Sequence, residues 1–249
     1  MAKNKKWILA AVAVLAVVLC CWAAWSKWAS TTRIGLVNFQ NYQTASLVKS
    51  NEDNFIEYEE IPLDRLDRLG RYDLVLGFGM GLKITEEQRA QILAAADEGT
   101  PIYIYAATNP ENDICSLDSL TKAGISAYIG NGNKRNYRNM ARYVRQHIDA
   151  KRLFVTPAEE AVESASDVLY HLDEDLSFKT VADYEKYLRE QGIYREKAPK
   201  IAIVGGLNDP FSGNRANIDS LIVSLQNAGM NVYPVSSYRQ RLAFLREIG

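Results

Sequence analysis

The stretch that decides the fold is Ala198–Val235, APKIAIVGGLNDPFSGNRANIDSLIVSLQNAGMNVYPV. Its first apolar run, Ile201–Val204, is interrupted by the glycines, asparagine and proline of 205–210. Apolar residues then recur at helical spacing over 217–228, and a glycine follows where a helix C-cap belongs. A second apolar run, Val232–Val235, comes next. The stretch therefore predicts a strand–helix–strand unit.

The chain before this unit repeats the same alternation of apolar strands and amphipathic helices. Strands are expected at 33–39, 54–59, 72–78, 101–106 and 125–129, with helices between them. Such alternation predicts an α/β fold with a parallel sheet covered on both faces, here a flavodoxin-like or Rossmann-like sandwich.

The same patterns divide the chain into four segments. These are a cytoplasmic tail and transmembrane anchor (1–29), the α/β sandwich (30–155), an acidic helical connector (156–198) and a second α/β domain (199–249). Two parallel strands do not enclose a core by themselves. We therefore expect 199–249 to be the truncated start of a larger domain.

The first segment has an uncharged apolar run from Trp7 to Trp25. A helix of this length crosses a hydrocarbon core of roughly 30 Å, so residues 7–28 are predicted to anchor the chain in a membrane. Lysines at positions 3, 5 and 6 indicate a single-pass protein of the inner membrane, with its N-terminus in the cytoplasm and its main domain in the periplasm. A cleaved signal peptide is the alternative interpretation.

Charge and cysteine content exclude several classes of protein. The chain has 29 basic and 30 acidic residues, and four of the lysines lie in the first 28 positions. The acidic remainder argues against nucleic-acid binding. Only Cys115 lies beyond the apolar run, so no disulfide framework is expected, and no phosphate-binding G-x-x-x-x-G-K-[ST] motif occurs.

A glycine-rich turn, Gly77–Gly81, follows the third expected strand, at the carboxyl end where α/β folds place ligands. Its spacing is not that of the G-x-G-x-x-G fingerprint. A ligand site and a simple tight turn are both compatible with it.

The helix expected over 134–149 carries arginines at 135, 138, 142 and 145 on one face and apolar residues on the other. Guanidinium groups in a row bind carboxylates, which makes Arg138 and Arg142 candidate substrate-binding residues. A solvated face paired with the protein's own acids explains the same pattern.

Two histidines complete the list of candidates. His147 projects from the apolar side of the arginine helix and is expected in the core or at its boundary, whereas His171 is a candidate ligand or proton-transfer residue as well as a structural one. The acidic residues around His171 lack the spacing of a calcium or zinc site, so neither a metal site nor a bound cofactor is predicted.

Beyond these patterns, KIAIVGGLNDPFSGNRANIDSLIVSLQNAGMNVYPV resembles a region of the large subunits of cobaltochelatases (CobN) and magnesium chelatases, which form one family. The segment from Asp167 to Leu188 is similar to the family's tyrosine-histidine turn and acidic-tyrosine helix, with Leu172 in place of a proline. The similarity runs from about Ala158 to Val235. The N-terminal apolar run adds a likeness to the membrane-anchored, HmuS-like haem-uptake members.

The resemblance implies a subunit that binds a tetrapyrrole, either haem or a cobalamin precursor. Cobalt or magnesium would be inserted, or the metal of haem removed, with ATPase partner subunits supplying energy. The resemblance also implies that this is the N-terminal part of a larger protein, inactive alone, whose catalytic residues lie beyond Gly249. The alternative is a membrane-tethered extracytoplasmic domain that binds or senses a ligand without catalysis. Which metal and macrocycle are handled, and in which direction, stays open.

Overall fold

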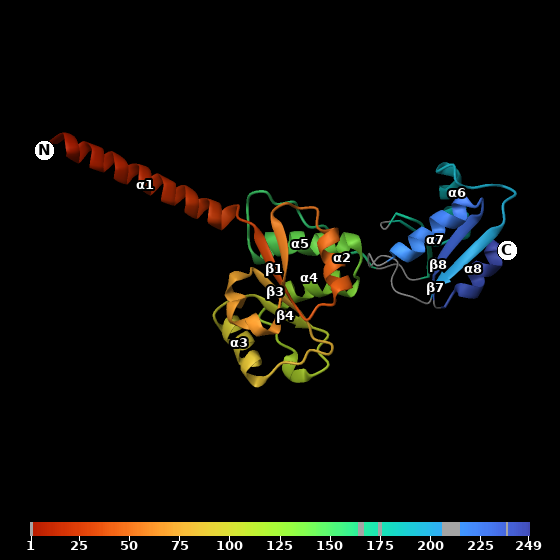
Figure 1. Ribbon diagram of the computed structural model, residues 1–249, viewed down its shortest axis with the longest axis horizontal. Coiled ribbons are helices and arrows are strands. Elements are labelled where there is room, and N and C mark those ends of the chain that lie inside the picture. Colours follow the sequence, from red (N-terminus) through yellow and green to blue (C-terminus); the bar gives the residue numbers. More distant parts are fainter. Residues whose placement is uncertain (1, 164–166, 174–175, 206–214, 238) are drawn as a thin grey trace. The chain divides into compact units, whose positions relative to one another are not determined.

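The computed structural model describes residues 2–163, 167–173, 176–205, 215–237 and 239–249 (Figure 1). Its elements are α1 (Ala2–Trp28), β1 (Thr32–Val37), α2 (Asn41–Ser50), β2 (Ile56–Ile61), η1 (Leu63–Arg71), β3 (Leu74–Phe78), α3 (Glu86–Asp97), β4 (Ile102–Tyr105), η2 (Pro110–Asn112), α4 (Ser119–Gly130), α5 (Lys134–Tyr143), η3 (Val144–Ile148), β5 (Val168–Tyr170), β6 (Ser177–Phe178), α6 (Val181–Glu190), β7 (Lys200–Gly205), α7 (Ala216–Asn227), β8 (Asn231–Ser236) and α8 (Arg241–Ile248).

The chain forms two compact units. Unit 1 comprises Met1–Phe39, Asp53–Ile125 and Met140–Glu159, and unit 2 comprises Gln40–Glu52, Ser126–Asn139 and Glu160–Gly249. Each unit is described by itself.

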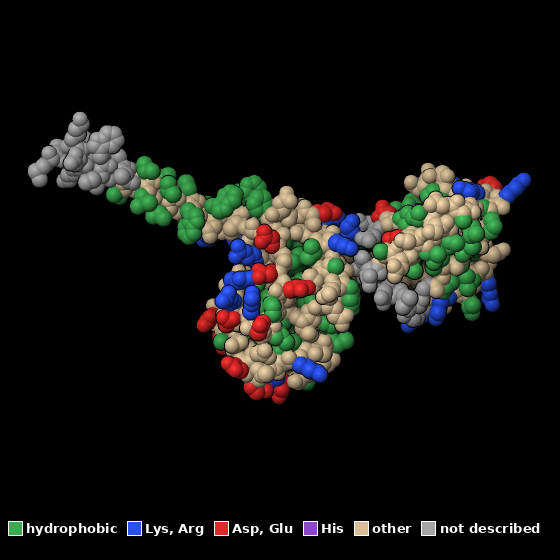
Figure 2. Space-filling model, viewed as in Figure 1, with side chains coloured by type: hydrophobic (Ala, Val, Ile, Leu, Met, Phe, Trp, Pro, Cys, Tyr) green, Lys and Arg blue, Asp and Glu red, His purple; other side chains and the backbone are tan. Residues whose placement is uncertain are grey.

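The N-terminal helix α1 forms, and its described side chains, from Val12 onward, are mostly apolar and exposed (Figure 2). Within the described part of the chain, however, no helix is long and apolar enough to cross a membrane. The prediction of a transmembrane helix over 7–28 is therefore wrong.

Sheet A lies in unit 1 and contains four parallel strands in the order β2-β1-β3-β4. Strands β1 and β3 are almost fully buried, as expected of central parallel strands, whereas β2 exposes its glutamates at the edge. The predicted α/β class with a parallel sheet is confirmed.

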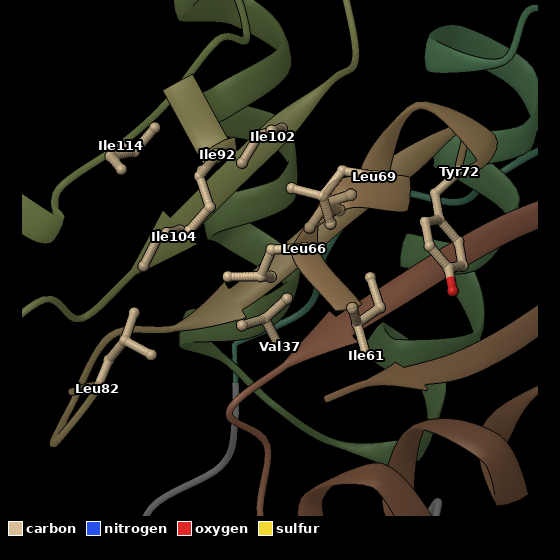
Figure 3. Close-up of a cluster of buried hydrophobic side chains, with 11 residues drawn as sticks. Val37, Ile61, Leu66, Leu69, Tyr72, Leu82, Ile92, Ile102, Ile104 and Ile114 are labelled. Carbon is tan, nitrogen blue, oxygen red and sulfur yellow. The ribbon is translucent and has the colours of Figure 1, made fainter. Parts of the chain in front are cut away.

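Both faces of sheet A are covered. One face packs against η1, α3 and the loop around Ile114 in an aliphatic cluster (Figure 3). Alternate residues of the central strands, whose side chains point to the opposite face of the sheet, are buried as well, namely Ile34, Leu36, Leu74 and Leu76.

Sheet B lies in unit 2 and has the order β6-β5-β8-β7. Strands β7 and β8 are parallel and joined by α7, so the predicted strand–helix–strand unit is confirmed. Of the interrupting loop, residues 206–210 lie outside the described residues. Strand β5 runs antiparallel to β8 and pairs with β6, which adds two strands from a segment predicted to be a helical connector.

Two local predictions are wrong. Residues 125–129 are not a strand, because α4 continues through them to Gly130, with Ile125 and Tyr128 buried at helical spacing.

The arginine helix is not continuous either, since α5 ends at Tyr143 and a π-helical turn, η3, follows. There Asp149 N–H donates to the Val144 carbonyl five residues earlier. This turn breaks the 3.6-residue period on which the solvated arginine face was predicted.

Arg145 consequently points inward and is only 1% exposed. We call the α1 junction the cluster that Arg145 forms with the end of α1, from Trp28 to Ser30, and with Leu153 and Phe154. Its guanidinium donates to carbonyl oxygens of Ser30 (2.8 Å), Leu153 (2.9 Å) and Phe154 (3.0 Å), among others. The Trp28 carbonyl, at the end of α1, accepts from the backbone N–H of Leu153 (2.9 Å). These bonds join the end of α1 to the segment after η3.

Candidate functional site

The parallel strands of sheet A bring their carboxyl ends to one edge of the sheet. From β1 the chain passes to β2 on one side, and then returns to β3 on the other side, so strand order reverses between β1 and β3. Ligands of open parallel sheets bind in the crevice at such a point. We call the residues that surround it the switch-point edge: Asn38, Phe39, Phe78–Gly81 and Tyr105–Ala107.

Asn38 ties two loops of this edge together. Its backbone has a φ of 59°, in the left-handed region that asparagine tolerates better than most residues. The side-chain amide nitrogen donates to the carbonyl oxygens of Phe78 (2.7 Å) and Met80 (3.4 Å). The loop after β1 is thereby held against the loop after β3.

The loops after β3 and β4 also approach closely. Gly79 N–H donates to the Tyr105 carbonyl (2.8 Å), and a Cβ added at Gly79 would lie 2.6 Å from the Cα of Ala107. Ala106 adopts a φ of 55°, in the left-handed region that is unfavourable for residues with a Cβ atom. Backbone strain of this kind concentrates at ligand-binding sites.

Three aromatic rings lie across the switch-point edge. Ring centroids are 6.3 Å apart for Phe39 and Phe78, 6.0 Å for Phe39 and Tyr105, and 5.5 Å for Phe78 and Tyr105. All three side chains are half-buried, and Met80 beside them is 56% exposed. The residues of this edge carry no charge. The rings are tilted to one another by 53–58°, so a planar, apolar ring system would stack on one of them at a time, beside the thioether of Met80.

Arg138 and Arg142, the predicted substrate-binding arginines, each bind an acid of the chain. In unit 2, Arg138 Nη1 lies 2.9 Å from Glu52 Oε1, and in unit 1, Arg142 Nε lies 2.8 Å from Asp53 Oδ2. The Thr156 hydroxyl donates to the other oxygen of Asp53 (2.8 Å). Substrate binding by these arginines stays a prediction, and it would require each to exchange its carboxylate partner for one of the ligand.

His171, the third predicted site residue, lies in unit 2 directly after β5 and is 3% exposed. The amide nitrogen of Gln226 lies 2.8 Å from its Nε2, and the Tyr187 hydroxyl lies 3.4 Å from its Nδ1. With Gln226 as donor, Nε2 accepts and Nδ1 carries the proton. Arg215, which is buried and pairs with Asp219, donates to the His171 carbonyl. Burial lowers the pKa of His171, and the positive charge of Arg215 lowers it further.

This lowered pKa predicts acid sensitivity of unit 2. A histidine with a lowered folded-state pKa binds fewer protons in the folded than in the unfolded chain, so stability is fully present above about pH 6.5 and falls as the pH drops below it. Urea unfolding at pH 7.5 and pH 5.5, followed through α7 and α8 by hydrogen exchange, measures this loss. His171→Phe should reduce the pH dependence, and an equal dependence in wild type and variant would contradict the prediction.

Residues 126–248 match the family model CobN/Magnesium Chelatase. The match covers 123 of the 249 residues and falls in the C-terminal half of the chain. The structure of the chain is similar to the catalytic subunit of cobaltochelatase from Mycobacterium tuberculosis, with a TM-score of 0.56 and 17% sequence identity over 87% of this chain. At this identity the likeness shows the fold, and the chain spans only 17% of that subunit's length. No curated protein matches the sequence.

The predicted site residues His171, Arg138 and Arg142 all lie within the residues that match this family model, whereas the switch-point edge precedes them. Sequence reasoning found Gly77–Gly81 but missed Asn38 and Tyr105. Asn38 could have been found from the sequence, because it is an asparagine directly after a buried strand, and a glycine-rich turn follows the next parallel strand.

His147, predicted in the core or at its boundary, is exposed. The described residues contain no group of three or more His, Cys, Asp or Glu side chains that could hold a metal.

Proposed function

We propose that this chain is the part of a chelatase-like subunit that receives a tetrapyrrole, and that the macrocycle stacks on the switch-point edge. The match of residues 126–248 to the CobN/Magnesium Chelatase family model is the observation that supports the functional class. The aromatic edge supports the choice of surface, because Phe39, Phe78 and Tyr105 offer uncharged rings where parallel sheets bind ligands.

In this proposal the metal is a substrate that is inserted into the macrocycle or removed from it. The chain's own contribution is to hold and orient the ring through stacking and backbone contacts. Asn38 and Gly79 act as positioning residues, since they fix the loops that carry Phe78 and Met80. The expected catalytic residues beyond Gly249, and the expected ATPase partners, stay predictions.

Titration of the full chain with metal-free protoporphyrin and with haem, followed by the absorbance of the macrocycle, tests this proposal. Phe78→Ala is expected to weaken binding at least about 5-fold, because one aromatic stacking contact contributes about 1 kcal/mol beyond its buried area. Tyr42→Ala removes an aromatic side chain that lies outside the switch-point edge and is more exposed than Phe78, at 46%, and it serves as the control.

The control variant should bind like the wild type, and circular dichroism should show that both variants fold. If Phe78→Ala does not fold, Phe78→Leu replaces the ring with an aliphatic side chain. Absence of binding by the wild type would refute tetrapyrrole recognition, whereas binding that is insensitive to Phe78 would refute the switch-point edge as its site.

A further inference from the structure

A hollow in unit 1 lies beside the edge strand β2, and its chemistry differs from that of the uncharged switch-point edge. It has a volume of about 100 Å³ and lies between the end of β2 and η1. Its walls include the side chains of Arg65, Arg68 and Arg71. This space admits a single polar group rather than a whole macrocycle.

The three arginines reach the same hollow because of the local backbone. Segment η1 is a series of short 3-10 turns that are interrupted at Arg65 and Arg68, whose backbone angles are not helical, and the arginines recur at every third residue along it. Leu66 and Leu69 share this spacing and are each 1% exposed in the core of unit 1. The arginines occupy the other side of η1, where all three are exposed to solvent.

Carboxylates balance part of this positive charge. Arg71 makes a close ion pair with Glu59 and donates to the Tyr72 hydroxyl (2.8 Å), so its guanidinium is fixed as one wall. Arg68 lies 3.7 Å from Asp67, but both side chains are at least 60% exposed, and such a pair is weak in water. Glu60 also lines the hollow. Three guanidinium groups thus face two glutamates, and the hollow keeps an excess of positive charge.

We propose that this hollow binds an oxyanion group, the carboxylate or phosphate of a small ligand, between Arg65 and Arg68. Guanidinium groups bind such groups through paired N–H donors, with geometry that a lysine does not reproduce. Arg71, oriented by Glu59 and Tyr72, closes the third side. This site is independent of the proposed tetrapyrrole surface.

Isothermal titration of the full chain with inorganic phosphate and with malonate, at constant ionic strength set by chloride, tests the proposal. We expect saturable binding of at least one of the two, and the stronger ligand distinguishes a phosphate from a carboxylate source. Arg65→Gln with Arg68→Gln should weaken binding at least 10-fold. Arg152→Gln, an exposed arginine elsewhere in unit 1, should leave it unchanged.

Several results would overturn the proposal: no saturable binding of either anion, equal weakening by Arg152→Gln, or competition by chloride at equal concentration. If the glutamine variant does not fold, Arg65→Lys with Arg68→Lys keeps the charge and removes the paired donors. The affinity of that variant for the anion should also fall at least 10-fold, and an affinity equal to that of the wild type would contradict guanidinium recognition. Protoporphyrin binding should be unaffected by these changes, so failure here is distinguishable from failure of the proposed function.

Discussion

Replacing Arg145 with methionine is expected to lower the free energy of unfolding of unit 1 by about 4 kcal/mol, since the change strands several buried carbonyl groups that cost about 1–3 kcal/mol each. The guanidinium serves six acceptors: Thr32 Oγ1 and the carbonyl oxygens of Ala29, Ser30, Phe55, Leu153 and Phe154. Methionine fills much of the volume and supplies no donor. Burial of the guanidinium lowers the pKa of Arg145.

Urea unfolding followed by tryptophan fluorescence measures this loss, because all four tryptophans lie in the first 28 residues and Trp25 contacts Phe154 (ring centroids 6.0 Å). Arg145→Lys keeps the charge but has fewer N–H donors, so its free energy of unfolding should fall between those of the wild type and Arg145→Met. Arg152→Met, at an exposed position, should change stability by no more than about 0.5 kcal/mol. A similar, small loss for the Arg145 and Arg152 variants would contradict the assigned role of Arg145.

Gly79→Ala is expected to cost about 2–3 kcal/mol and to weaken porphyrin binding, because overpacking against fixed backbone forces the structure to move. The added Cβ would lie 2.6 Å from the Ala107 Cα and 2.8 Å from the Ala107 nitrogen, distances that no side-chain rotation relieves. The loops after β3 and β4 would therefore separate, and the hydrogen bond from Gly79 to Tyr105 would lengthen.

Thermal unfolding and the porphyrin titration together measure both effects. Gly130→Ala provides the control, since nothing lies within 4 Å of a Cβ added at this helical glycine, and alanine favours a helix. Its stability should equal or slightly exceed that of the wild type. A Gly79→Ala protein with wild-type stability and affinity would show that the switch-point edge is not closely packed.

The parts of the fold that local patterns predict are those whose determinants are contiguous in sequence. Strands β1, β3, β4, β7 and β8 are apolar runs between turn residues, and each forms close to its predicted position. Helix α3 begins with a capping box whose two residues are three positions apart, with the Thr85 hydroxyl accepting from Gln88 N–H (3.2 Å) and the Gln88 side chain accepting from Thr85 N–H (2.9 Å). Periodicity and capping act over a few residues, so the sequence shows them directly.

The features that were missed depend on distant partners. Strands β5 and β6 are three and two residues long, and they are stabilised by pairing with β8 and with each other rather than by their own propensity. Arg145 reads as a surface residue until the π turn and the carbonyls around Ser30 and Leu153 are known. Asn38 and Tyr105 likewise meet at the switch-point edge only after the strand order of sheet A is fixed.

The α1 junction has a mechanical consequence. The carbonyl oxygens of Ser26 and Trp28, in the last turn of α1, accept hydrogen bonds from residues beyond η3. The Phe154 ring lies between the rings of Trp25 and Phe55, and its centroid is 4.5 Å from that of Phe55, on which it stacks. A helix joined by one flexible peptide would swivel, whereas this attachment resists bending at several points. A force applied to the far end of α1 would act as a lever on Phe55, beside β2, and on Thr32 in β1, so that load passes into sheet A as torque instead of being lost at a hinge.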